Sequence, residues 1–569
     1  MRKILRTLKK SFLRDNREIN PEDIFLDSTN LPNLNQDRLE GMIERPIGEK
    51  TFLFVRVVLS LVLIFLGAEL WILQVSKGEV YREISEENRL GRTAIFADRG
   101  IIFDRNGLPL VVNEIKPDES DFAARKYPNI EGLGAVVGYV KYPSMDSAKR
   151  YYDELFHGQS GVEKTYDSLL SGSNGSKLTE TNALGEKTSE SIVDSPQDGK
   201  DIHLSIDAKL TEKLFQSIRA TSKEKGFTGG AGVIMDVETG EVLALTSYPS
   251  YDQNIVTEGK DSAEISKLLN DKSTPFLNRA VSGLYTPGSI VKPIVALGAL
   301  NEGVITSTKQ ILSTGQISLP NPYDPKNPSI FRDWRAHGWV DMIDALAVSS
   351  DVYFYEVGGG FGNQKGLGIS NLDKYFSLFG MNEKTNIDLP GEEEGYIATP
   401  SWKEKNFPDD PIWRVGNTYH TSIGQYGTQV TPIEVVRWVA AIANGGKLIT
   451  PRVLFGINGD KPRVDRRVDL AEDFFVIVRK GMREGVTRGV ATGLSIPEVK
   501  VAAKTGTAEL GARKEFVNSW ITGFFPYDTP KYAFAIIMER GPVTNTVGGV
   551  FVMRQVLDWM TVNTPEYLK

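Results

Sequence analysis

The apolar run at residues 57–75 is the feature that most limits the structures open to this chain. It is interrupted only by Ser60, Glu69 and Gln74. As a helix with a rise of about 1.5 Å per residue, a run of this length approaches the ~30 Å hydrocarbon thickness of a bilayer. The pattern predicts a single transmembrane helix at residues 52–75, with a buried core helix as the alternative. Its depth in the chain and the lack of a small-residue cleavage site argue against a conventional signal peptide.

Charges on either side of this run set its expected orientation. Basic residues are almost balanced close to it, but five more lie within residues 1–10. Because positively charged flanks stay on the cytoplasmic side, they favour a cytoplasmic N-terminus. We expect residues 1–51 to form a cytoplasmic tail that is partly disordered, since no hydrophobic period is sustained there. Glu69 would cost roughly 2–3 kcal/mol at the membrane centre, so it lies near the interface or faces a partner helix.

Length and composition exclude several classes of protein. A chain of 569 residues is too long for one hydrophobic core, so two or three domains are expected. A net charge of −7 argues against nucleic acid as the main partner. The chain has no cysteine, and its four histidines lack metal-ligand spacing. We therefore expect neither a metal site nor another cofactor.

The first chemical motif is Ser289-x-x-Lys292. A Pro-Gly turn precedes it and an apolar run follows, which predicts a helix that starts at Ser289 and stops at Gly303. Pro293 is tolerated there because the first helical N–H groups have no intrahelical partner. Lys292 would share a face with Ser289, and a hydroxyl beside an amine base is the minimum for covalent acyl transfer. Alone, the motif is more often a capped helix with an exposed lysine.

Two later segments strengthen this interpretation. Ser349-x-Asp351 lies within a stretch expected to be helical, residues 340–357, and Lys504-Thr505-Gly506-Thr507 follows a strand-like run. Taken singly, these residues are typical of a helix cap or a strand threonine. S-x-x-K, S-x-[ND] and K-T-G in this order are the motif set of penicillin-binding proteins and serine β-lactamases.

The remaining patterns predict an α+β fold in which one antiparallel sheet is flanked by helices, because strands occur at both ends of residues 201–569 with helices between them. A hairpin is expected at 231–246. Residues 76–200 are expected to form a separate, smaller, strand-rich domain. Its polar Gly/Ser-rich tract at 171–198 indicates a flexible segment or a hairpin. Residues 311–339 are expected to form loops or a cleft wall. The other expected elements are a helix capped by Asp207 that runs to Ile218, helices at 434–444, 471–484 and 548–561, and strands at 499–508, 519–525 and 532–539.

With these motifs in place, the chain resembles a class B penicillin-binding protein from residue 52 to residue 569. Further motifs that carry the resemblance are residues 94–100, 104–107, 158–170, 231–254, 277–280 and 422–425. Residues 332–334 and 352–355, and the aspartate of S-x-D, are similar to the elongation branch, penicillin-binding protein 2. The division branch more typically has S-x-N, and it remains the alternative. The resemblance implies a transpeptidase domain at 201–569 and a pedestal domain, of the dimerisation type, at 76–200.

The resemblance implies DD-transpeptidation of peptidoglycan. A stem peptide ending in D-Ala-D-Ala acylates Ser289, and a neighbouring peptide's amine then takes the acyl group. Lys292 would act as the base, Ser349 would pass the proton to the leaving amine, and Asp351 would orient the network. β-Lactams would act as acyl mimics of D-Ala-D-Ala that leave slowly.

The last motif would bind and polarise the substrate. Lys504 would add positive charge, and the hydroxyls of Thr505 and Thr507 would hold the terminal carboxylate. Gly506 would let the substrate backbone approach the strand. The backbone N–H groups of Ser289 and Thr507 would form an oxyanion hole, worth roughly 3–4 kcal/mol per donor.

A lysine base must lose its proton before it can act. A free lysine has a pKa of about 10.4, so at pH 7 only about one in 2,500 is neutral, a cost of roughly 4.6 kcal/mol. Desolvation, the positive end of a helix and a nearby Lys504 would each lower the pKa of Lys292. Buried lysines shift by up to about 3–5 pKa units, so a lysine base is feasible.

The family also implies a location and a membrane partner. The chain would be a single-pass protein of the bacterial inner membrane, with its transpeptidase domain outside the cytoplasm. Its partner would be a polytopic glycan polymerase of the SEDS type. No glycosyltransferase domain fits before residue 200, which argues against a bifunctional class A enzyme.

Three alternatives to transpeptidation remain. A membrane-anchored β-lactamase or carboxypeptidase would need an activated water, and no motif supplies the base for it. A catalytically inactive β-lactam sensor or scaffold would not need the complete motif set.

His337, beside Asp333, is expected to be a fold or cleft residue, with a ligand or base as the alternative.

Overall fold

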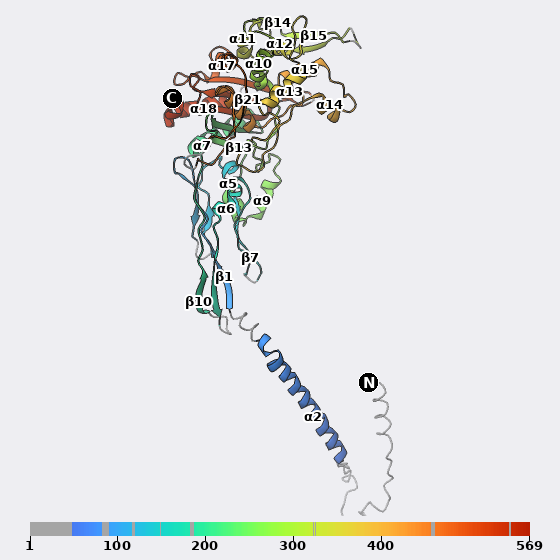
Figure 1. Cartoon of the computed structure of the whole chain (residues 1–569), viewed down its shortest axis with the longest axis vertical. Coiled ribbons are helices and arrows are strands. Elements are labelled where there is room, and N and C mark those ends of the chain that lie inside the picture. Colours follow the sequence, from blue (N-terminus) through green and yellow to red (C-terminus); the bar gives the residue numbers. More distant parts are fainter. Residues whose placement is uncertain are drawn as a thin grey trace, which may run out of the picture. The chain divides into compact units, whose positions relative to one another are not determined.

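The computed structural model describes residues 48–81 and 90–569, apart from 116–119, 148–149, 182–186, 322–323, 325, 457–460, 512 and 546–547. The chain divides into two compact units, residues 1–89 and Leu90–Lys569. Figure 1 shows both units, coloured along the sequence. The expected cytoplasmic tail lies almost entirely outside the described residues.

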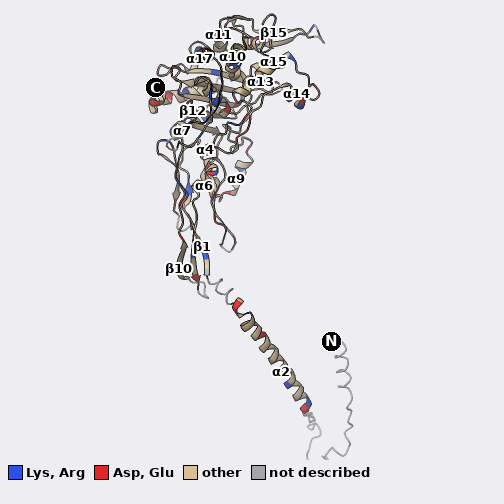
Figure 2. Cartoon of the chain, in the orientation of Figure 1, with Lys and Arg blue, Asp and Glu red and all other residues tan. Residues whose placement is uncertain are grey.

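The first unit contains one long helix, α2 (Glu49–Trp71), which continues as a π-helical turn, η4 (Ile72–Ser76). In the described part of the chain it is the one helix long and apolar enough to cross a membrane. Its charged residues lie close to its two ends (Figure 2). Glu69 is in the last turn of α2, away from the helix centre where a charge costs most.

The second unit begins with a strand-rich region, residues 90–204, which we call the pedestal. Strand β1 (Leu90–Ile95) pairs antiparallel with β9 (Gly175–Thr181), and β9 pairs antiparallel with β10 (Lys187–Asp194). The described residues of the Gly/Ser-rich tract therefore form two paired strands, in line with the hairpin alternative. A second sheet has the order β11-β2-β3-β4, with bounds Ile202–His203, Ile102–Phe103, Pro109–Glu114 and Ala124–Lys126.

A buried ion cluster holds the pedestal together around Glu163 of α5 (Gly161–Thr165). One oxygen of Glu163 accepts from Arg99 Nε at 2.7 Å and the other from Arg125 Nε at 2.8 Å. The side chains of Glu163 and Arg125 are 0% exposed, and Arg99 also pairs with Asp167. A charge removed from water to this degree is tolerated only with its partners in place.

We expect Glu163→Gln to lower the free energy of unfolding by about 3–5 kcal/mol, because it leaves two buried guanidinium groups without their shared counter-charge. Thermal unfolding of the full-length chain in detergent would measure this loss. The matched control is Asp528→Asn, which breaks an exposed pair with Lys500 and should change the melting temperature little. Equal melting temperatures for the two variants would contradict the structural role of the cluster.

The core of the second unit is a five-stranded antiparallel sheet with the order β13-β12-β22-β21-β20. The expected hairpin is β12 (Gly229–Asp236) and β13 (Val242–Tyr248). The three expected C-terminal strands are β20 (Ala502–Leu510), β21 (Phe516–Phe525) and β22 (Tyr532–Pro542). The predicted α+β fold is confirmed, and β20, which carries the K-T-G motif, forms one edge of the sheet.

Helices cover both faces of this sheet. Successive strand side chains point to opposite faces. Ile234 accordingly packs in the same core cluster as residues of α7 (Ala208–Lys225) and α18 (Gly548–Asn563). Its neighbours Val233 and Met235 pack in the other cluster, with α16 (Pro432–Ala443). Asp207 caps α7 as expected by accepting from Leu210 N, but α7 extends beyond Ile218 to Lys225.

Two expected helices differ in detail from the structure. The stretch 340–357 is broken into α11 (Met342–Val348) and α12 (Asp351–Gly359), because Ser349 adopts a left-handed conformation with φ 61°. The helix expected from Ser289 begins as a 3-10 turn, η5 (Gly288–Val291), and becomes α10 (Lys292–Asn301). Proline lacks the N–H that an α-helical interior needs, so Pro293 lies within the first turn of α10.

The segment expected to form loops or a cleft wall, residues 311–339, contains two strand pairs of an irregular hairpin that ends at Val340. Strand β14 (Ile311–Ser313) pairs with β17 (Gly338–Val340), and β15 (Gln316–Leu319) pairs with β16 (Ser329–Arg332). The remaining helices are α4 (Gly134–Val137), α6 (Asp167–Leu170), α8 (Gln253–Glu258), α9 (Ser262–Leu269), α13 (Gly368–Leu378), α14 (Pro400–Asn406), α15 (Val415–Ser422), α17 (Glu472–Thr487), η6 (Thr492–Leu494) and η7 (Pro565–Leu568). The remaining strands are β5 (Val140–Lys141), β6 (Ser144–Met145), β7 (Tyr151–Asp153), β8 (His157–Gly158), β18 (Lys447–Ile449) and β19 (Val464–Arg467).

Candidate active site

The S-x-x-K motif lies on the 3-10 turn η5 and the first residue of α10. Ser289 is half-buried, and its carbonyl oxygen accepts a hydrogen bond from the backbone N–H of Lys292. Side chains three residues apart eclipse one another in a 3-10 turn. The turn therefore directs the hydroxyl of Ser289 and the fully buried side chain of Lys292 to the same side.

The K-T-G strand β20 packs directly on this turn. A Cβ at Gly506 would lie 2.8 Å from Pro287 O and 2.8 Å from Ile290 Cγ2, so only glycine fits there without a shift. Trp520 of the neighbouring strand donates from its indole N–H to Thr286 O at 3.0 Å. These contacts fix the position of Ser289 along β20.

Thr505 and Thr507 lie two residues apart on β20, so their side chains share one face of the strand. Thr505 is half-buried and Thr507 is exposed. The same segment thus presents two hydroxyls beside the nucleophile turn, where a ligand from solvent can reach them.

The S-x-D motif supplies the second side of the site. Ser349 is only 7% exposed and joins the end of α11 to Ser350, the N-cap of α12. Lys292 Nζ donates to Ser349 O at 2.8 Å and to Asp351 Oδ1 at 2.6 Å, and lies 3.4 Å from Ser349 Oγ. The first and second motifs therefore meet through the side-chain nitrogen of Lys292.

Lys504 completes the cluster from the third motif. Its Nζ donates to Ser349 Oγ at 2.7 Å and to Thr505 O at 2.9 Å. Burial lowers the pKa of Lys504 well below its usual value, and the nearby charge of Lys292 lowers it further. Burial raises the pKa of the Asp351 carboxyl, against the effect of its partner Lys292. Ser349 Oγ therefore lies between two amines, one of which is strongly disposed to lose its proton.

The structure thus brings the predicted residues together in two groups. Lys292, Ser349, Asp351 and Lys504 are joined by direct hydrogen bonds, whereas Ser289, Thr505, Gly506 and Thr507 are joined by the packing of η5 on β20. Chemically, the site offers a partly accessible hydroxyl, a proton path through Lys292 and Ser349, and hydroxyl and amine groups beside it for an anionic ligand.

Residues 422–425, one of the segments that carry the family resemblance, close the site from another side. Gly424 has φ 72°, accepts from Gly288 N at 2.9 Å, and has no room for a Cβ against Gly288 O. Gln425 Nε2 reaches Thr507 O at 3.4 Å. A glycine followed by a polar residue is compatible with a turn, but nothing in the residues themselves predicts where that turn docks.

His337 packs in the wall beside the site. Its ring contacts Trp334 at a centroid distance of 5.0 Å, and its Nε2 lies 3.5 Å from Asp333 Oδ1. Burial lowers the pKa of His337. The histidine therefore belongs to the support of the site, in line with its expected place as a cleft or fold residue.

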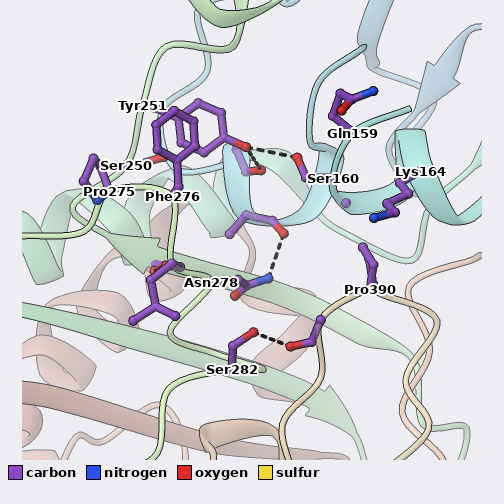
Figure 3. A pocket seen from close by; sticks show the side chains of 16 residues that line it. Gln159, Ser160, Lys164, Ser250, Tyr251, Pro275, Phe276, Asn278, Ser282 and Pro390 are labelled. Carbon is purple, nitrogen blue, oxygen red and sulfur yellow. Dashed lines mark hydrogen bonds between the residues drawn. The ribbon is translucent and has the colours of Figure 1, made fainter. Parts of the chain in front are cut away.

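A separate cavity of about 250 Å³ lies between the pedestal, residues 247–251 at the end of β13, and residues 275–282 before the nucleophile (Figure 3). Tyr251 and Phe276 stack beside it with ring centroids 4.6 Å apart. Its polar groups are largely used within the fold, since Asn278 Nδ2 donates to Ala135 O and Ser282 Oγ to Gly391 O. None of the eight predicted site residues lines this cavity.

Comparisons with known proteins agree with this architecture. The penicillin-binding protein transpeptidase domain matches residues 230–551, and the penicillin-binding protein dimerisation domain matches residues 120–204. The peptidoglycan D,D-transpeptidase MrdA of Escherichia coli K12 is 29% identical, over 86% of this chain and 90% of that protein.

Two solved structures are similar over most of their length. One is a complex between penicillin-binding protein 2 and MreC from Helicobacter pylori, with a TM-score of 0.68, 28% identity, and coverage of 83% of this chain and 99% of that one. The other comes from work on the coordination of polymerization and crosslinking by a peptidoglycan synthase complex, with a TM-score of 0.67, 27% identity, and coverage of 90% and 98%.

The chain belongs to the penicillin-binding protein transpeptidase family, and its transpeptidase and dimerisation domains make it a class B member. Within that class it is similar to penicillin-binding protein 2, the MrdA type, and it is a serine-type peptidoglycan D,D-transpeptidase.

Proposed function

We propose that this protein crosslinks peptidoglycan stem peptides through an acyl-enzyme on Ser289 during cell-wall elongation. The observation that carries the proposal is the position of Ser349 Oγ, 2.7 Å from Lys504 Nζ and 3.4 Å from Lys292 Nζ, with Lys292 one turn after Ser289. Three motifs remote in sequence thereby form one proton-transfer cluster next to one hydroxyl.

In the acylation step, Ser289 Oγ attacks the carbonyl carbon of the penultimate D-Ala, and its proton passes to neutral Lys292. The resulting ammonium is stabilised by Asp351 Oδ1 at 2.6 Å and Ser349 O at 2.8 Å. The proton then moves through the hydroxyl of Ser349 to the leaving amine, the C–N bond breaks, and D-Ala departs. Asp351 orients this relay.

In the transfer step, the amine of a second stem peptide attacks the ester carbonyl. It gives up a proton along the reverse path, and Ser289 regains its hydroxyl as the crosslink forms. Thr505 and Thr507, beside the side-chain amine of Lys504, bind the terminal carboxylate of the donor peptide. Gly506 admits the donor backbone, and the N–H groups of Ser289 and Thr507 stabilise the oxyanion.

The pedestal and the anchor support an assembly at the membrane. We propose boundaries of 1–51 for a cytoplasmic tail, 52–75 for the transmembrane helix, 76–200 for the pedestal domain and 201–569 for the transpeptidase domain, outside the inner membrane. The relatives solved with MreC and within a peptidoglycan synthase complex support an elongation role and a glycan polymerase, of the SEDS type, as partner.

The test uses the full-length chain in detergent with nascent glycan strands that carry pentapeptide stems. Mass spectrometry of the digested product should reveal crosslinked muropeptide dimers, with one D-Ala released per crosslink. Free tetrapeptides without dimers would instead identify a carboxypeptidase, and turnover of penicillin to its hydrolysed acid would identify a β-lactamase. A chain that takes up penicillin but never yields either peptide product would be a sensor.

A further inference from the structure

Asp333 is a buried carboxylate next to the site for which the proposed reaction has no use. Its side chain is 0% exposed, in the turn between β16 and β17. One oxygen, Oδ1, accepts from Trp334 N at 2.8 Å and faces His337. Such a group is costly to bury, so its acceptor capacity must be used.

The other oxygen, Oδ2, is directed at the start of α12. It accepts from Ser350 Oγ at 2.8 Å and from Val352 N at 3.0 Å, and Ser313 Oγ of β14 lies 3.2 Å away. Ser350 Oγ in turn accepts from Tyr353 N at 3.3 Å as the cap of α12. A single carboxylate therefore ties the hairpin to both residues that flank Asp351.

The segment that Asp333 holds in place begins next to Ser349, whose backbone is strained. Ser349 holds φ 61°, a conformation that side-chain-bearing residues avoid and keep only where the surroundings enforce it. Ser350 directly follows Ser349. The position of the Ser349 hydroxyl, which must lie between Lys292 and Lys504, therefore depends on how Ser350 is held. The anchor is Asp333.

We propose that Asp333 is a positioning residue for transpeptidation, which fixes the left-handed turn at Ser349 through Ser350 and Val352 N and adds a negative charge behind Asp351. The proposal rests on the proposed function of the Ser349 cluster. The charged and titratable groups around the two carboxylates are Lys292 and Lys504 on the Asp351 side, and His337 and Arg335 on the Asp333 side. The phenol of Tyr355 interacts with both carboxylates, which add to the effect of burial in raising its pKa. The charge of Asp333 contributes to the raised pKa of Asp351.

The test compares Asp333→Asn with the wild-type full-length chain in detergent, with a fluorescent penicillin as the probe. The second-order acylation rate at pH 7 should fall at least tenfold. Burial is the main cause of the raised pKa of Asp351, and asparagine removes the negative charge that raises it further, so Asp351 stays ionised to lower pH. The acid limb of the pH–rate profile should therefore shift to lower pH by half a unit or more.

Two further variants separate positioning from folding. Asp341→Ala removes the N-cap of α11, which accepts from Asp344 N at 2.9 Å, and should lower the melting temperature without changing acylation per folded molecule. Ser350→Ala removes the hydroxyl link but keeps the Asp333 charge, so it should slow acylation and leave the acid limb in place.

An unmoved acid limb in Asp333→Asn, or equal acylation losses in Asp333→Asn and Asp341→Ala once corrected for folded fraction, would overturn the proposal. If Asp333→Asn does not fold, unchanged acylation by Ser350→Ala would do so. A wild-type chain that is not acylated at all would count against the proposed function instead.

Discussion

After treatment with penicillin, the full-length chain should gain the mass of one intact β-lactam, and Ser289→Ala should gain none. The alanine variant lacks the hydroxyl that forms the ester, and removing the nucleophile of a serine hydrolase costs about 10⁶-fold in rate. Ser289 is half-buried on the turn η5, so alanine fits its place and the fold should be retained. Intact-mass spectrometry measures both results directly.

The matched control is Ser282→Ala, seven residues earlier. Its hydroxyl donates to Gly391 O at the separate cavity and not within the Ser349 cluster. This variant should acquire one β-lactam as the wild type does. An adduct on Ser289→Ala, mapped by peptide digestion to another serine, would refute Ser289 as the nucleophile and require a new assignment of the mechanism.

Lys292→Met should slow acylation by about 10³-fold or more, since positioned proton transfer contributes 10²–10⁴-fold and methionine cannot accept a proton. Methionine matches the length of the lysine stem, so the buried channel that it occupies stays filled. The variant also removes the contacts of Lys292 with Ser349 O, Ser349 Oγ and Asp351 Oδ1, so the relay to the leaving group is broken as well.

For Lys292→Met, a loss of protein stability must be distinguished from a loss of proton transfer during acylation. Lys292→Met strands the carboxylate of Asp351, which should cost about 3 kcal/mol. The double variant Lys292→Met/Asp351→Asn should recover most of that stability, measured by thermal unfolding, while acylation stays lost. Recovery of acylation along with stability would mean that Lys292 is a structural residue only.

A buried lysine elsewhere provides the matched control. Lys403 is 2% exposed and pairs with Asp410 at 3.1 Å, far in sequence from the motifs. Lys403→Met should lose stability but acylate at the wild-type rate per folded molecule. A loss of acylation as large as that of Lys292→Met would show that the assay reports folding and not proton transfer.

The sheet was predictable from sequence because its signals are local. The turn between β12 and β13, the three C-terminal strands and the cap of α7 by Asp207 each follow from residues next to one another. The hairpin between β14 and β17 was not predictable. Its two strand pairs, β14 with β17 and β15 with β16, join across a Pro-, Asn- and Gly-rich sequence that by itself indicates loops.

The identity of the site residues was also predictable from local motifs, but the residues that hold them in place were not. The order of the three motifs indicates which residues to expect, and the sheet brings β20 against η5. The break at Ser349 was missed because residues 340–357 have a continuous helical pattern. The reason for the break is Asp333, a residue of the hairpin whose contact with Ser350 depends on tertiary packing.

The place of β20 at the margin of the sheet has a consequence for what the enzyme can recognise. A terminal strand has partners on one side only, so an extended peptide can continue the sheet on the other side through main-chain hydrogen bonds. Such binding depends on the direction and spacing of the peptide backbone rather than on the identity of the side chains. This arrangement therefore favours low selectivity for the side chains along the donor peptide and high selectivity for its carboxyl end.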